Sequence, residues 1–142
     1  MLRAIHIILY VRDPSASREF YATVLGTRPT LDVPGMIEFP LGPRTVLGLM
    51  PEAGITRLLG PDVDPSKARG VARAELYLVV DDPEAFHARA LAAGAREVSP
   101  LAARDWGHRA AYSLDADSNV LAFASPLSPP ACGARPPERG GT

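Results

Sequence analysis

Residues 4–26, AIHIILYVRDPSASREFYATVLG, decide the fold. The segment begins with an isoleucine-rich apolar run around His6, which indicates a buried β-strand. Asp13 and Pro14 come next and are typical of a helix start, because Asp caps free backbone N–H groups and proline lacks one. A small or apolar residue then recurs every fourth position up to Gly26, which predicts an amphipathic helix with a glycine cap. These positions are Ala16, Phe20 and Val24.

The same pattern returns in the second half of the chain. Residues 74–80 are another strand candidate, Asp82 and Pro83 open a second helix, and Gly94 closes it. Three short strand candidates, separated by turn residues, follow each helix. They are 29–33, 36–39 and 45–49 in the first half, and 96–99, 108–114 and 120–124 in the second, with a polar hairpin loop at 115–119. The order strand, helix, three strands therefore occurs twice, which predicts two similar modules.

Two segments lie outside this repeat. The connection over residues 51–73 is longer than most loops in compact domains, so we expect part of it to pack over a site. Residues 126–142 are rich in Pro and Gly, and their composition predicts a disordered tail. The single cysteine, Cys132, lies in this tail, so we expect no structural or catalytic thiol.

The composition excludes several classes of protein. A chain of 142 residues predicts one domain, and its 15 basic and 16 acidic residues give a net charge of −1. No basic stripe is present, which argues against nucleic-acid binding, and one cysteine excludes an intrachain disulfide or a multi-cysteine metal site. No apolar run suits a membrane helix and no signal-peptide pattern begins the chain. We therefore expect a cytoplasmic protein without a membrane partner, and the preference for arginine over lysine favours a GC-rich bacterial source.

The tandem arrangement resembles the vicinal oxygen chelate superfamily, which includes glyoxalase I, extradiol dioxygenases and bleomycin-resistance proteins. Four segments carry the resemblance: HIILYVRD (6–13), EFYATVLG (19–26), ELYLVVDD (75–82) and DADSNVLAF (115–123). In the last of them Ala116 and Ser118 replace the Pro and Gly of the family's hairpin. The resemblance implies an α+β fold in which two βαβββ modules, about 3–50 and 73–125, form a curved mixed-sheet cup. A linker at 51–72 joins the modules in a single domain over 1–125.

The resemblance also implies where a metal would bind. In metal-using members the first and last strand of each module supply one ligand each. Carried over by position, these are His6, Gly48, Glu75 and Ala122. Gly48 and Ala122 have no side chain that binds a metal, and their strand neighbours offer none either. A single imidazole and a single carboxylate would hold a metal weakly, so we expect no metal or other cofactor.

The implied cup supplies candidate ligand-binding residues. Strand alternation places His6 and Tyr10 on one strand face, and Glu75 and Tyr77 on the matching face of the second module. Trp106 is a candidate for stacking on a planar ligand, and Met50 for an adaptable apolar wall. The ligand-binding set is thus His6, Tyr10, Met50, Glu75, Tyr77 and Trp106.

Each candidate also has a purely structural interpretation. His6 is expected to bond to a neighbour such as Glu75, and the two residues are also a possible acid–base pair. Trp106 is equally compatible with a core or dimer-interface residue. Glu38 and Arg44 are expected to be solvated hairpin charges, and His87 to lie on an exposed helix face. His108 shares a strand face with Tyr112 and is a weak candidate for the cup rim.

These observations favour a metal-free protein that binds a small organic molecule, such as an aromatic or peptide antibiotic, and confers resistance by sequestering it. Its expected partners are the ligand and a second copy of the chain in a homodimer. The alternative is a lyase, isomerase or dioxygenase of the glyoxalase type with Zn, Ni, Mn or Fe bound at His6 and Glu75. The fold alone does not choose between them, because it hosts several chemistries.

Overall fold

The computed structural model describes residues 1–127, so Cys132 and most of the predicted tail lie outside the described residues. The order strand, helix, three strands occurs twice, as predicted. The first module contains β1 (Ile5–Val11), α1 (Pro14–Leu25), β2 (Leu31–Val33), β3 (Met36–Gly42) and β4 (Thr45–Pro51). The second contains β5 (Glu75–Val79), α3 (Pro83–Ala92), β6 (Arg96–Ala103), β7 (His108–Leu114) and β8 (Val120–Pro126). Pro126 thus ends a strand instead of opening the tail.

The two modules build separate four-stranded sheets with the same topology. The strand orders are β1-β4-β3-β2 and β5-β8-β7-β6. In each sheet the first and last strands of the module pair in parallel and the other neighbours are antiparallel. β1 and β5 are therefore edge strands of mixed sheets, and the α+β architecture of two tandem modules is confirmed.

Local sequence signals set the ends of α1. The Asp13 carboxylate accepts a hydrogen bond from the Ala16 N–H at 3.1 Å, which satisfies one free donor of the first turn. At the other end Gly26 adopts a left-handed conformation, with φ of 67°, and its N–H donates to the Ala22 carbonyl. Asp82 caps α3 in the same way as Asp13 caps α1, by accepting from the Ala85 N–H.

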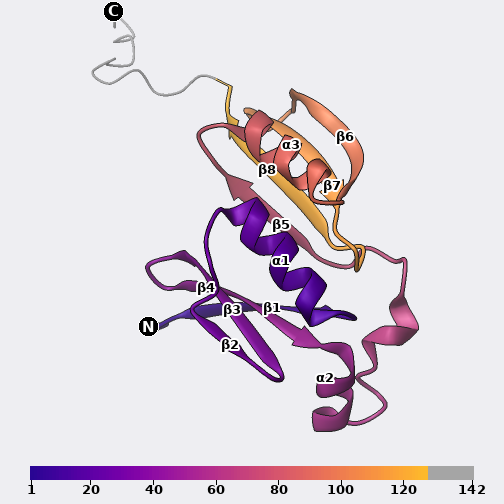
Figure 1. Cartoon of the computed structure of the whole chain (residues 1–142). Coiled ribbons are helices and arrows are strands. Elements are labelled where there is room, and N and C mark those ends of the chain that lie inside the picture. Colours follow the sequence, from indigo (N-terminus) through magenta and orange to yellow (C-terminus); the bar gives the residue numbers. More distant parts are fainter. Residues whose placement is uncertain (128–142) are drawn as a thin grey trace, which may run out of the picture.

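Both helices lie between the two sheets (Figure 1). α1 packs against β4 and α3, and α3 packs against the sheet of its own module. One apolar core therefore includes side chains from both sheets, among them Leu9, Phe39 and Leu49 from the first and Leu76 and Phe123 from the second. Each sheet buries its helix-facing side in this core, so its other side faces away from the rest of the chain.

The helix-facing side of β1 is buried only near its C-terminal end. Leu9 and Val11 are buried, as predicted, but Ile5 and Ile7 are exposed to 49% and 36%. The apolar run predicts a strand that is buried along its whole length, and this is wrong for its first residues. β1 is an edge strand and α1 packs over its neighbour β4, so the start of β1 projects beyond the core.

Polar contacts fix the two modules relative to each other. The Tyr21 hydroxyl of α1 donates to the Asp115 carboxylate in the β7–β8 hairpin at 2.6 Å, and both residues are buried. The Arg12 N–H donates to the Asp117 carboxylate at 3.0 Å, and the Arg12 guanidinium forms an ion pair with it at 3.6 Å. The hairpin of one module thus joins the β1–α1 corner of the other.

The connection between the modules is more ordered than the sequence indicated. It contains a helix, α2 (Glu52–Leu59), and a 3-10 turn, η1 (Pro65–Ala68). α2 is anchored by Ile55, its buried residue, and contacts β1 and β4. None of the helices over residues 1–127 is long and apolar enough to cross a membrane.

Candidate functional site

The side of the first sheet that faces away from the helices is called here the first open face. Alternation along the strands places these residues on it: His6, Ile8, Tyr10, Met36, Glu38, Gly48 and Met50. His6 lies opposite Val46, Ile8 opposite Gly48 and Tyr10 opposite Met50 in the β1–β4 register. The predicted site residues His6, Tyr10 and Met50 therefore share one surface.

The partner of His6 differs from the one we expected. His6 Nδ1 lies 3.1 Å from the Glu38 carboxylate, so the imidazole pairs with a residue of its own sheet and not with Glu75. Glu38 was expected to be a solvated hairpin charge, but its side chain is only 21% exposed. β4 lies between β1 and β3, and Glu38 faces the same side of the sheet as His6. The two side chains therefore meet across β4, next to Gly48.

The corresponding surface of the second sheet, the second open face, carries most of the aromatic candidates. It contains Glu75, Tyr77, Val79, His108, Ala110, Tyr112, Ala122 and Ala124. The three alanines are fully buried, whereas Glu75 and Val79 are exposed. Small side chains in the middle of the sheet thus leave room for the larger aromatic rings that cover them.

A chain of hydrogen bonds orders the aromatic side chains of this face. The Trp106 indole N–H donates to the Tyr77 oxygen at 2.8 Å, and Tyr77 lies 2.7 Å from His108 Nδ1. The Tyr77 oxygen therefore joins the indole and the imidazole, and it donates to Nδ1 in the His108 tautomer that carries its proton on Nε2. The Tyr77 and His108 rings also stack, with centroids 5.8 Å apart. Trp106 itself is 55% exposed, which excludes a place in the core of one chain.

An arginine adds a cation to the same cluster. Arg104 lies over the Tyr112 ring, with its guanidinium carbon 5.2 Å from the centroid. Hydrogen bonds to the Ser99 hydroxyl and the Ala110 carbonyl hold Arg104 in place. Burial and the negative charge of Glu75 raise the pKa of Tyr112, so this phenol stays neutral at physiological pH. The neutral ring of Tyr112 therefore lies near the positive charge of Arg104 and the negative charge of Glu75.

The predicted site residues do not all meet within one chain. His6, Tyr10 and Met50 belong to the first open face, whereas Glu75 and Tyr77 belong to the second, where Trp106 bonds to Tyr77. The shared helical core separates the two sheets. Their assignment as a ligand site stays a prediction, and it requires the two open faces to meet in some assembly.

The residues at the family's metal positions do not fit a metal. A Cβ on Gly48 would lie 2.5 Å from Ile8 Cδ1 and 3.1 Å from Met36 Sδ, so apolar side chains already fill that space. Ala122 is fully buried between Tyr77 and Tyr112. Within residues 1–127 no three His, Cys, Asp or Glu side chains come together as a possible ligand set.

His87 was expected on an exposed helix face and is instead buried, with 7% exposure. Its Nε2 lies 2.9 Å from the Glu97 carboxylate of β6, and its ring lies near Phe123. α3 therefore turns Pro83, His87 and Ala90 toward the protein. This contact is on the helix side of the sheet and is not part of either open face.

Comparison with known proteins establishes the class. The model of the Glyoxalase/Bleomycin resistance protein/Dioxygenase superfamily matches residues 3–123, so the chain belongs to this superfamily. No curated protein matches the chain in sequence.

Several solved structures share the fold. One is a glyoxalase-related enzyme from Fulvimarina pelagi, with 21% identity, 88% of each chain covered and a TM-score of 0.73. A second is a glyoxalase/bleomycin resistance protein/dioxygenase family enzyme from Burkholderia phytofirmans PsJN, with 20% identity, 86% of this chain and 97% of that chain covered, and a TM-score of 0.74. A third, from Nocardioides, has 21% identity, 96% and 91% coverage, and a TM-score of 0.73.

Proposed function

We propose that this protein binds a planar or aromatic organic molecule without a metal, and protects the cell by sequestering an antibiotic or similar compound. The observation that carries the proposal is the aromatic cluster of the second open face. Trp106, Tyr77 and His108 are joined by hydrogen bonds, and Tyr112 lies beside them under Arg104. Hydrogen bonds hold these rings in place, so a planar ligand would stack on them with little loss of conformational freedom.

Charge adds a preference within this class of ligand. Glu75 is exposed at the start of β5 and has no ion-pair partner within residues 1–127. A cationic group on the ligand would supply that partner, and aromatic rings also attract cations through their faces. The proposed ligand is therefore a planar aromatic compound with a positive charge.

A second copy of the chain completes the proposed site. Both open faces point away from the shared core, so the first open face of one chain is available to cover the second open face of another. Two such contacts related by a twofold axis would give a homodimer with two equal sites. Each site would join His6, Tyr10 and Met50 of one protomer to Glu75, Tyr77 and Trp106 of its partner.

Intrinsic fluorescence tests the proposal directly, because Trp106 is the only tryptophan in the chain. We would titrate the full-length protein with metal-free bleomycin and with mitomycin C, each with and without EDTA. Saturable quenching that EDTA does not change is the expected result for at least one of the two compounds. Tyr77→Phe removes the oxygen that accepts from the Trp106 indole N–H and that bonds to His108, so it should weaken binding about threefold or more.

The matched control is Tyr21→Phe, which removes a phenol hydroxyl from the module contact and not from an open face. It should leave the affinity unchanged while the protein stays folded. Binding that EDTA abolishes and Zn²⁺ or Ni²⁺ restores would contradict the proposal in favour of the metalloenzyme. Quenching that is identical in Tyr77→Phe would remove the second open face from the site.

A further inference from the structure

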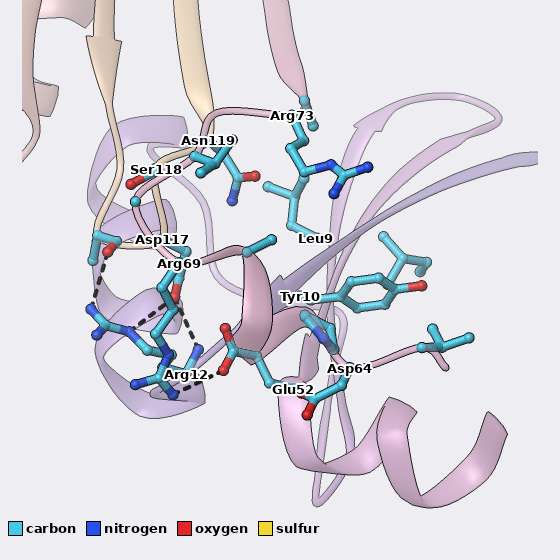
Figure 2. A pocket seen from close by; sticks show the side chains of 18 of the residues that line it. Leu9, Tyr10, Arg12, Glu52, Asp64, Arg69, Arg73, Asp117, Ser118 and Asn119 are labelled. Atoms are coloured by element: carbon cyan, nitrogen blue, oxygen red, sulfur yellow. Dashed lines mark hydrogen bonds and ion pairs between the residues drawn. The ribbon is translucent and has the colours of Figure 1, made fainter. Parts of the chain in front are cut away.

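A cleft separate from the aromatic cluster lies where the two modules and their connection meet (Figure 2). Its volume is about 660 Å³, which is within the range of pockets that hold small organic molecules. The end of β1 forms one wall, the connection from Asp62 to Ala74 forms another, and the β7–β8 hairpin closes it. The prediction that the connection packs over a site is consistent with this arrangement.

Most charges in the cleft already have partners. Arg12 forms an ion pair with Asp117, and Arg69 with Glu52 at 3.2 Å. Asp64 accepts hydrogen bonds from the hydroxyl and the N–H of Ser66. Figure 2 shows the two ion pairs gathered at one end of the cleft.

Arg73 is the exception among the arginines of the cleft. It lines the cavity, but its guanidinium makes no ion pair or hydrogen bond with any residue of the described chain 1–127. In Figure 2 it lies away from the two ion pairs, above Tyr10. An arginine fork matches a carboxylate in geometry and charge, so Arg73 is available to bind one.

The other residues that line the cleft indicate the chemistry of the part of the ligand that carries the carboxylate. Ile8, Tyr10, Val63 and Val71 give the cleft apolar and aromatic surface around the arginine. Asp62 also lines the cleft and has no ion pair with the residues that the structure describes, so its charge opposes an anion there. We infer that this cleft is a second binding site, which takes a small carboxylic acid with an aromatic or apolar body and holds its carboxylate on Arg73. The site goes beyond the proposed antibiotic site, with which it shares only the β1 residues Ile8 and Tyr10.

The test uses benzoate and its neutral analogue benzamide on the ¹⁵N-labelled full-length protein, at constant ionic strength. Benzoate should shift the backbone amide signals of Arg73, Ser118 and Asn119 saturably, with a Kd of about 1 mM, as expected for so small a ligand. Benzamide should bind at least about fivefold more weakly, because it lacks the charge.

Two variants test the role of charge, one by removing a positive charge from the cleft and the other by removing a negative charge. Arg73→Gln should weaken benzoate at least about fivefold, to the level of benzamide, whereas Asp62→Asn should tighten it about twofold. Both residues are exposed and make no ion pair within residues 1–127, so neither change should unfold the protein. Arg44→Gln, on the β3–β4 turn outside the cleft, is the matched control that should change nothing. Equal shifts by benzoate and benzamide, or an unchanged benzoate affinity in Arg73→Gln, would overturn the inference. Shifts confined to Trp106 and His108 would overturn it too, because they place the carboxylate on the second open face.

Discussion

Ser118 occupies a backbone conformation that suits glycine. Its φ is 65°, in the tight turn between β7 and β8 where the family's hairpin has a glycine. A left-handed conformation costs an L-residue about 1 kcal/mol, whereas glycine adopts it freely. Ser118→Gly should therefore stabilise the protein by about 0.5–1 kcal/mol in urea unfolding. A loss of stability would show that the Ser118 side chain contributes more than the backbone strain costs.

Asp117 is stabilised in its neutral form by its surroundings. Burial raises its pKa above 3.8, aided by the charges of Asp115 and Glu52, while the Arg12 N–H and guanidinium act in the opposite direction. A carboxyl group with a raised folded-state pKa adds stability below its unfolded pKa, and this stability is lost as the pH rises through the folded pKa.

This shift gives a pH-dependent difference between the wild type and Asp117→Asn. As the pH falls from about 7 to about 3, the free energy of unfolding of the wild type should improve relative to that of the variant. Urea unfolding of both proteins across this range measures the difference. A difference that stays constant or changes in the opposite direction would show that the Arg12 ion pair dominates the pKa of Asp117.

The helix caps could be predicted from neighbouring residues in the sequence, whereas contacts between residues far apart in the sequence could not. Asp13 and Gly26 act through backbone groups of their own helix, so the sequence alone located both ends of α1. Glu38 was expected in solvent, but strand pairing brings it next to His6. His87 was also expected in solvent, but the orientation of α3 on its sheet brings it next to Glu97. No local pattern contains that information.

At the scale of the elements, the Tyr21–Asp115 hydrogen bond joins α1 to the hairpin of the other module. The bond is buried and its acceptor is charged, so Tyr21→Phe should cost about 1–3 kcal/mol of stability. Asp115 keeps three hydrogen bonds within its turn, from the Asp117 N–H and from the N–H and side-chain amide of Asn119. The variant should therefore fold, with a lower midpoint in urea.

The same bond predicts how stability changes in alkali. Burial, together with the nearby charge of Asp115, raises the pKa of Tyr21 well above 10.0. Its contribution is complete below the unfolded pKa of about 10 and is lost as the pH rises toward the folded pKa, because only the unfolded state then ionises. The stability advantage of the wild type over Tyr21→Phe should thus decrease above about pH 10. An advantage that stays constant there would place Tyr21 in contact with solvent.

The connecting element α2 was not predictable for a different reason. Pro51, Gly54 and Gly60 are typical of a loop, and the segment is short for a helix. Ile55 is buried against the first sheet, and this tertiary contact stabilises a helix that local propensity does not favour. The connection consequently forms one wall of the cleft at Arg73 instead of a free loop.

At the scale of the molecule, the arrangement of the two modules determines where a ligand can bind. The helices occupy the space between the sheets, so the two open faces of a chain point away from each other. The resemblance implied candidate residues on two sheet faces, and their role as a ligand site stays a prediction. It did not indicate whether one chain or two would bring those faces together. We propose that two chains do so.

Mixing two defective variants tests this claim most directly. One variant carries His6→Ala and Tyr10→Ala on the first open face and keeps Trp106, and the other carries Trp106→Leu on the second open face. Neither variant alone should show saturable quenching by the compound that binds the wild type.

After the two are unfolded and refolded together, quenching should return, because a mixed dimer joins the intact first face of one chain to the intact second face of the other. Trp106 of the first variant would report that site alone. Quenching that does not return, although the two chains form a mixed dimer by native mass spectrometry, would contradict a site shared between copies.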